Sequence, residues 1–233
     1  MSTLYVIRHG QASFGKADYD ELTPLGVDQS RRLGRWLVDS EIRIDRMWVG
    51  PRRRQRDTAR HMIAAAEGRL PEPEDAPGLD EYPAELVMRL ALPQLLEVDD
   101  EARHVFGGDP LGVPTDARRF QRVFERVMKR WVAGGLELEG AESFTAFTAR
   151  VRDAYADIMI AAGRGTTIAV VTSAGPTSVA CQLALELSDP AVLKVSWVVA
   201  NTGLAELRFA DGELTLVSFN SVPHLPRDLV TYR

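Results

Sequence analysis

Near the amino end of the chain stands Leu4-Tyr5-Val6-Ile7-Arg8-His9-Gly10-Gln11, the stretch that decides the fold. Its first four residues are apolar, and most of them are β-branched or aromatic, which predicts a short strand buried on both faces. Strands of this kind belong to parallel sheets with helices on each side, so the stretch favours an α/β fold. Arg8 and His9 follow at the carboxyl end of the strand, where open α/β sheets place their ligands. For this tripeptide alone, a basic strand end closed by a turn at Gly10 is the alternative.

Length and composition restrict the classes of protein open to this chain. A chain of 233 residues forms one large domain or one domain with an insertion, and 45% hydrophobic residues supply a core. The formal net charge of -5 argues against a general nucleic-acid-binding surface. No uncharged apolar run is long enough to span a bilayer, and the first strand begins too early to leave room for a signal peptide. The sequence predicts a cytoplasmic protein without nucleic-acid or membrane partners, for which a homodimer stays open.

The single cysteine and the lack of metal-binding motifs bear on cofactors. Cys181 lies in an apolar run, so we expect it in the core, and one cysteine cannot form an internal disulfide. The sequence contains no CxxC or HExxH motif. We therefore expect neither a metal nor a cofactor.

Hydrophobic periodicity and turn residues predict the elements on both sides of the middle of the chain. Before residue 84 we expect a helix that begins at Thr23-Pro24, a strand over 47–49, a helix from there to about Ala66, and a connecting loop over 70–77. After residue 140 we expect a helix over 144–162, a strand over 167–172, a helix from there to Leu187, and a hairpin around Asp211-Gly212.

Between about 84 and 140 the pattern changes to helices without strands. The first runs from Glu85 to about Leu92, where Pro93 stops it, and the clearest helix of the chain covers about 117–133. Basic side chains fill one face of that helix, which is either a solvated face or a mouth lined for anionic substrates. We interpret 1–233 as one α/β domain in which 84–140 is a helical cap over the carboxyl edge of the strands.

Two helix starts are expected to bind anions. Arginines crowd the first turn of the helix that follows Gly50-Pro51, within Arg52-Arg53-Arg54-Gln55-Arg56. A helix N-terminus already carries partial positive charge, so such a cluster suggests an anion in front of it, although for any single arginine a solvated side chain is the simpler interpretation. At Ser173-Ala174-Gly175-Pro176, small residues turn a buried strand directly into a helix and present backbone N–H groups.

Guanidinium groups, an imidazole and helix N-terminal amides together suit a phosphate dianion. A neutral imidazole such as that of His9 is a good nucleophile toward phosphorus, and arginines neutralise the equatorial oxygens of the transition state. Glu81 lies at the end of an element because Pro83 prevents helical geometry at the residue before it, and its carboxyl could protonate a departing alkoxide. We expect Gln11 and Ser13 to be further loop contacts to the substrate. This chemistry needs no metal.

Val6-Ile7-Arg8-His9-Gly10-Gln11 resembles the signature of the histidine phosphatase superfamily, the phosphoglycerate-mutase-like proteins. The family's second motif, Ser-Pro-Leu-x-Arg-Ala-x-Gln-Thr-Ala, resembles the residues from Gly50 to Ala59 and places the phosphate-binding arginine at Arg54. The family's Leu-x-Glu motif is similar to Leu79-Asp80-Glu81 and nominates Glu81 as the acid. The closing pattern of the family, Asn and then His-Leu, is similar to Asn220 and His224-Leu225, so the resemblance covers nearly the whole chain.

The resemblance implies a three-layer α/β sandwich with a mostly parallel central sheet, helices on both faces and a helical insertion. It also implies a metal-independent phosphomonoester hydrolase that acts on a small phosphorylated metabolite through a phosphohistidine at His9. In this hypothesis Arg8 and Arg54 hold the phosphoryl group, Ser173 and the Ala174 amide complete the cradle, and Glu81 is the proton donor.

One departure from the family pattern concerns Ser173. The family has Val-Ser-His-Gly-Gly after the later strand, and its histidine contacts the transferring phosphoryl group, whereas this chain has Val171-Thr172-Ser173-Ala174-Gly175. A serine hydroxyl can donate to a phosphate oxygen but carries no positive charge. Loss of one such preorganised contact typically costs about 10²–10³ in rate, so we expect reduced activity.

Three alternatives remain open. A phosphate-binding relic without turnover is favoured by Ser173 itself, and a mutase is a less favoured option within the family. An α/β-hydrolase would use Ser173 as nucleophile, with Asp189 or Asp211 and then His224. That interpretation leaves Arg8-His9 without a role and has valine where a tight nucleophile elbow needs glycine.

Overall fold

Strands of one mixed sheet form the centre of the computed structural model, which describes residues 1–13, 20–107, 117–136 and 138–232. The strand order is β3-β2-β4-β1-β5-β6. Their bounds are β1 (Ser2–Arg8), β2 (Arg46–Val49), β3 (Pro73–Asp75), β4 (Thr167–Thr172), β5 (Leu204–Ala210) and β6 (Glu213–Ser221). The pairs β1·β4, β2·β4 and β2·β3 are parallel, and the hairpin β5–β6 extends the sheet in antiparallel fashion. The predicted mostly parallel sheet is confirmed.

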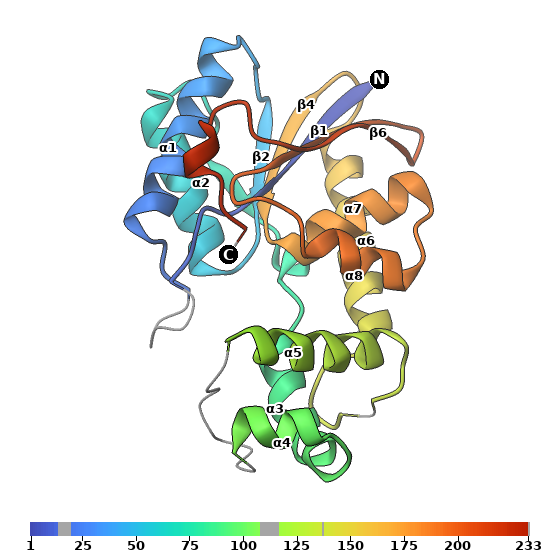
Figure 1. Ribbon diagram of the computed structural model, residues 1–233. Helices are drawn as coiled ribbons and strands as arrows, with labels where there is room; N and C mark the ends of the chain where they lie inside the picture. Colours follow the sequence, from blue (N-terminus) through green and yellow to red (C-terminus); the bar gives the residue numbers. More distant parts are fainter. Residues whose placement is uncertain (14–19, 108–116, 137, 233) are drawn as a thin grey trace.

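Helices cover both faces of this sheet (Figure 1). On one face lie α1 (Pro24–Asp39) and α2 (Arg53–Ala65), whose apolar residues pack with alternate residues of β1, β2 and β4. On the other face lie α6 (Phe144–Ala162) and α7 (Ala174–Leu185), with α8 (Asp189–Ser196) packed against α7. Short 3-10 turns occupy Pro77–Leu79 and Arg227–Leu229. The resulting three layers confirm the predicted α/β sandwich, and every helix in the described ranges is too short or too polar to cross a bilayer.

The middle of the sheet places the first strand beside the second long apolar strand. Val6 and Ile7 are fully buried, and β1 pairs with β4 in a register that sets Arg8 opposite Thr172. The N–H of His9 then donates to the carbonyl oxygen of Thr172 at 2.8 Å. His9 and Ser173 therefore leave the sheet next to each other, at the carboxyl ends of neighbouring parallel strands.

The region predicted as an insertion folds into α3 (Ala84–Val98), α4 (Asp100–Phe106) and α5 (Ala117–Val132), which gather beyond one end of the sheet (Figure 1). The basic face of α5 does not stand alone. Arg122 and Arg126 both bind Glu101 of α4, and Arg126 also binds Asp99. These two arginines therefore hold α4 against α5, and the acidic side chains of α4 and Asp99 neutralise their charge. They do not support the alternative in which the basic face lines a mouth for anionic substrates.

Two predictions about element boundaries were wrong. The helix expected to stop at Pro93 continues through it to Val98. Pro93 is exposed, so water can reach the backbone carbonyl that loses its partner there, and the helix continues. The loop expected over 70–77 contains strand β3, which begins at Pro73 and pairs only with β2. A proline is tolerated there because β3 is an edge strand, where a missing N–H breaks no inner ladder.

Candidate active site

The side chain of His9 is fixed by the carbonyl that follows it. His9 is 3% exposed, and its Nδ1 lies 2.7 Å from the carbonyl oxygen of Gly10. A carbonyl oxygen can only accept, so Nδ1 must carry the ring proton and the lone pair must be at Nε2. The backbone around it is fixed as well, because the N–H of Gly10 donates to Thr58 Oγ1 and Asn201 Nδ2 donates to the carbonyl of His9. His9 therefore presents Nε2 as a base or nucleophile in a fixed orientation.

Arg54 meets that nitrogen directly. Its Nε donates to His9 Nε2 at 3.1 Å, although the two residues stand 45 positions apart, and both side chains are buried. Burial lowers the pKa of His9 well below its usual 6.5, and the charges of Arg54 and Arg8 lower it further. The imidazole is therefore neutral at physiological pH, as a nucleophile must be. The expectation that folding brings this imidazole and this guanidinium together is met.

Arg8 ties the site to the far end of the described chain. Its Nη1 donates to the carbonyl oxygens of Val199 and Tyr232, the latter at 2.9 Å. Gln29 and Asn201 hold the same segment, 229–232. Gln29 Nε2 donates to the carbonyl of Leu229 and to Thr231 Oγ1, the N–H of Asn201 donates to the carbonyl of Thr231, and Thr231 Oγ1 donates to Asn201 Oδ1. The guanidinium beside His9 thus depends on the last described residues for its position.

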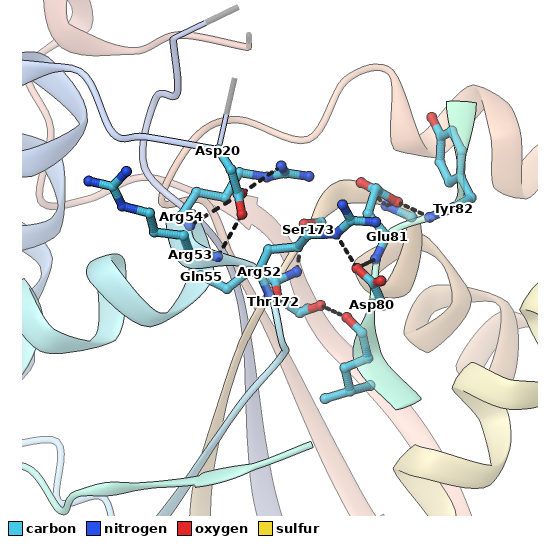
Figure 2. Close-up of polar contacts among 12 residues, drawn as sticks. Asp20, Arg52, Arg53, Arg54, Gln55, Asp80, Glu81, Tyr82, Thr172 and Ser173 are labelled. Atoms are coloured by element: carbon cyan, nitrogen blue, oxygen red, sulfur yellow. Dashed lines mark hydrogen bonds and ion pairs between the residues drawn. The ribbon is translucent and has the colours of Figure 1, made fainter. Parts of the chain in front are cut away.

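Asp20 lies against the start of α2, where sequence reasoning expected an external anion. Its carboxylate accepts from the N–H of Arg53 at 2.8 Å, from that of Arg54 at 3.4 Å and from Arg54 Nη1 at 2.9 Å (Figure 2). Backbone amides at a helix start and an arginine fork are the donors that phosphate oxygens need. The site thus holds an oxyanion from its own chain. Nothing in the sequence marks Asp20, because an acid in a polar loop is ordinarily solvated.

The start of α7 lies against the start of α2. Ser173 is fully buried, and its Oγ accepts a hydrogen bond of 2.7 Å from Nε2 of Gln55 on α2 (Figure 2). The N–H of Ala174 donates to no acceptor within the described ranges, so it is open to a ligand. The sequence analysis named Ser173 and Ala174 but missed Gln55. The one feature that could have indicated Gln55 is that the family motif has alanine at this position.

Glu81 is held by backbone amides. Its carboxylate accepts from the N–H of Gly175 at 3.1 Å and from its neighbour Tyr82 at 3.0 Å. The fit excludes a side chain at Gly175, because a Cβ there would lie 2.1 Å from Glu81 Oε1. Burial raises the pKa of Glu81, against the opposing charges of Arg54 and Arg8 and the two amide hydrogen bonds. A carboxyl with a raised pKa holds its proton to a higher pH than a solvated glutamate and is better suited to donate it.

The segment that carries Glu81 is anchored to the sheet and to α6. Thr172 Oγ1 donates to the carbonyl of Leu79 at 2.8 Å, and Arg150 Nη1 donates to the carbonyls of Gly78 and Asp80. The carboxylate of Asp80 in turn binds Arg52 Nε (Figure 2). These contacts fix Glu81 relative to the end of β4, where Ser173 begins α7.

Two predicted loop contacts have other partners. Gln11 accepts from the Thr23 hydroxyl through Oε1 at 2.8 Å, and its N–H donates to Gln29. Ser13 is buried, and its N–H donates to the carbonyl of Glu21. Both residues therefore shape the loop beside α1, and their roles as substrate contacts remain predictions.

The triad expected of an α/β-hydrolase is not assembled. The Ser173 hydroxyl contacts Gln55 rather than a histidine, and His224 Nε2 is 2.8 Å from Thr202 Oγ1. Asp189 accepts from Gln182, and Asp211 forms an ion pair with Arg164. No proton could therefore pass from Ser173 to His224, because a triad needs direct hydrogen bonds between its members.

Comparison with known proteins agrees with this geometry. The model of the Histidine phosphatase superfamily (branch 1) matches residues 4–133 and 97–222. No curated protein matches the sequence of this chain.

Several solved structures share the fold. A phosphoserine phosphatase mutant from Entamoeba histolytica, in complex with phosphoserine, has a TM-score of 0.67 at 20% identity over 97% of this chain and 100% of that chain. A phosphoglycerate mutase from Bacillus anthracis has a TM-score of 0.64 at 18% identity, with 96% and 94% covered. An alpha-ribazole phosphatase from Shigella flexneri has a TM-score of 0.61 at 19% identity, with 94% and 96% covered. At such identities the similarity shows a common fold.

Proposed function

Because the chain belongs to the histidine phosphatase superfamily (branch 1), we propose that it hydrolyses a small phosphomonoester through a phosphohistidine at His9. The observation that carries this proposal is the contact of Arg54 Nε with His9 Nε2 in a buried site. When Arg54 Nε turns from His9 Nε2 to a phosphoryl oxygen of the substrate, the lone pair of the neutral imidazole becomes free to attack the phosphorus.

The first half-reaction transfers the phosphoryl group to the protein. His9 Nε2 forms a bond to phosphorus while the bond between phosphorus and the ester oxygen breaks, and the electron pair of that bond leaves with the alkoxide. Glu81 gives its proton to the alkoxide, so the alcohol departs neutral and Glu81 becomes a carboxylate. Arg8 and Arg54 balance the charge on the transferring oxygens.

The second half-reaction restores the enzyme. A water molecule attacks the phosphorus of the phosphohistidine, and the Glu81 carboxylate takes the proton that the water loses. The bond from phosphorus to Nε2 breaks, inorganic phosphate leaves, and both residues regain their starting protonation states. Over the whole cycle, Glu81 gives one proton to the alcohol and regains one from the attacking water.

Ser173 and Ala174 complete the proposed cradle. The Ala174 N–H and the Ser173 hydroxyl offer donors at the start of α7. Serine adds no positive charge where the family pattern has histidine, so we expect turnover below that of a two-histidine site, by about 10²–10³.

Substitution of the nucleophile tests the proposal. We expect His9→Ala to abolish release of p-nitrophenol from p-nitrophenyl phosphate, while His61→Ala, a histidine replacement on α2 outside the site, leaves it unchanged. Mass spectrometry of acid-sensitive peptides after a rapid quench should find phosphate on His9 in the unsubstituted protein. Retained turnover in His9→Ala would refute the assignment.

A binding protein without turnover is the second candidate, and Ser173 favours it. In that case calorimetry should detect inorganic phosphate binding, with no hydrolysis of any phosphomonoester in a broad metabolite screen. A mutase would instead return an isomeric phosphate ester rather than free phosphate, which product analysis separates from both.

A further inference from the structure

Gln55 is a buried side chain whose two polar ends are both engaged. It is 0% exposed, as is Ser173, and it joins the start of α2 to the start of α7. Its Oε1 accepts from the backbone N–H of Arg52 at 3.0 Å, and its Nε2 donates to Ser173 Oγ at 2.7 Å. A Cβ at Gly50 would lie 2.3 Å from Gln55 Oε1, so the side chain has no room to move on that side.

The orientation of the Gln55 amide follows from its backbone partner. The N–H of Arg52 can only donate, so the group facing it must be the carbonyl oxygen of the amide. The NH₂ group must then face Ser173, and the serine oxygen must accept. The Ser173 hydroxyl makes no other hydrogen bond within the described ranges, and it does not cap α7. Its proton is therefore available to an acceptor in the site.

We infer that Gln55 is a positioning residue, which keeps the Ser173 hydroxyl proton directed at a phosphoryl oxygen of the substrate. Without that NH₂ group, a buried serine hydroxyl ordinarily donates to the nearest protein carbonyl, as Ser178 and Thr177 do one turn further along α7. Phosphate oxygens only accept, so a hydroxyl already turned toward them loses no internal bond on binding.

The identity of the acceptor, a phosphoryl oxygen, rests on the proposed function. The orientation of the Gln55 amide does not. The inference also explains a pair of departures from the family motifs, which have alanine where this chain has Gln55 and histidine where it has Ser173. The side chain at the Gln55 position is larger here than in the family motif, and the side chain at the Ser173 position is smaller. The two side chains meet in one buried space, so they act as a unit.

Gln55→Glu separates positioning from helix capping. A glutamate at the third helical position accepts from the N-cap N–H as glutamine does, so α2 keeps its cap. The second carboxylate oxygen, however, accepts the Ser173 proton and withdraws it from the phosphate. The introduced charge also repels phosphate directly, and the Ser173→Ala background isolates that effect because it has no hydroxyl proton to withdraw.

The experiment is a double-mutant cycle of Q55E and S173A, with thermal unfolding as a check on the fold. The readouts are the Kd of inorganic phosphate by calorimetry and kcat/KM for p-nitrophenyl phosphate. We expect S173A to weaken phosphate binding about tenfold or more in the natural sequence, because the lost hydrogen bond is to a charged group. In the Q55E background we expect S173A to change binding less than twofold.

An equal loss from S173A in both backgrounds would overturn the inference, and so would no loss from S173A in the natural sequence. The proposed function fails separately. If phosphate binds and the cycle is non-additive but His9→Ala hydrolyses as well as the natural protein, Gln55 positions Ser173 in a site whose nucleophile is another group.

Discussion

Replacement of Glu81 by glutamine should slow the hydrolysis of alkyl phosphates far more than that of aryl phosphates. Glutamine has the shape of the natural side chain and can keep its carbonyl oxygen where Glu81 Oε1 now accepts from Gly175 and Tyr82. The variant therefore retains the contacts that hold this wall of the site. It loses only the proton that the proposed mechanism gives to the departing alkoxide.

The size of the effect follows from the role of a general acid, which typically contributes about 10²–10⁴ in rate. We expect a loss of this order in kcat for glycerol phosphate, whose leaving group is a strong base. For p-nitrophenyl phosphate, whose leaving group is stable as an anion, we expect a loss below tenfold. Steady-state kinetics on both substrates, with phosphate release as the readout, gives the ratio.

The two pKa shifts also predict the direction in which activity changes with pH. Burial raises the pKa of Glu81 and lowers that of His9 well below 6.5, which favours the protonated Glu81 and the neutral His9 that the proposed mechanism requires. Activity should fall as pH rises through the raised pKa of Glu81, and Glu81→Gln should abolish that alkaline decline. Equal losses on the two substrates, or an unchanged alkaline limb, would show that another group supplies the proton.

Three further predictions follow from contacts in and near the site. Asp20→Asn removes the charge that competes for Arg54, so the Kd of inorganic phosphate should fall severalfold; a weaker affinity would show that Asp20 instead supports the site. Ser173→His should reduce kcat/KM for p-nitrophenyl phosphate, because Gln55 fills the space that an imidazole needs. Adding Gln55→Ala to Ser173→His should raise kcat/KM at least tenfold above that of Ser173→His alone. Full activity in Ser173→His alone would contradict this prediction. Burial lowers the pKa of His224 to about 4, so the native state binds this proton at a lower pH than the unfolded chain does. The native state therefore loses up to about 3 kcal/mol of stability against unfolding as pH falls from 6.5 to 4. Urea unfolding at pH 7 and pH 5 should show a smaller acid loss in His224→Asn, and an identical loss would exclude this residue as the cause.

Much of the fold could be predicted from local sequence because its strongest signals are local. The apolar run of β1 and the spacing of apolar residues in α5 each determine an element without reference to the rest of the chain. Strand β3 could not be predicted in this way, since Pro73–Asp75 forms a strand only because β2 presents a free edge. Pro93 was misread for a similar reason, because its exposure depends on how α3 packs.

The residues of the candidate site also differ in whether local sequence reveals them. His9, Arg54 and Glu81 lie at element ends and match motifs, so the sequence names them, and the structure brings His9 and Arg54 into contact. Gln55 and Asp20 act through partners more than 30 positions away, and no pattern within one segment reveals such pairs. Their importance lies in which donor faces which acceptor, and only coordinates give that information.

The anchoring of Arg8 to the last described residues has a practical consequence. Loss of segment 229–232 would remove the carbonyl of Tyr232 from the Arg8 guanidinium at the end of β1, and the carbonyl of Leu229 from Gln29, while no residue of a strand is removed. A variant that lacks segment 229–232 should therefore keep its circular dichroism spectrum but lose the phosphate affinity proposed above.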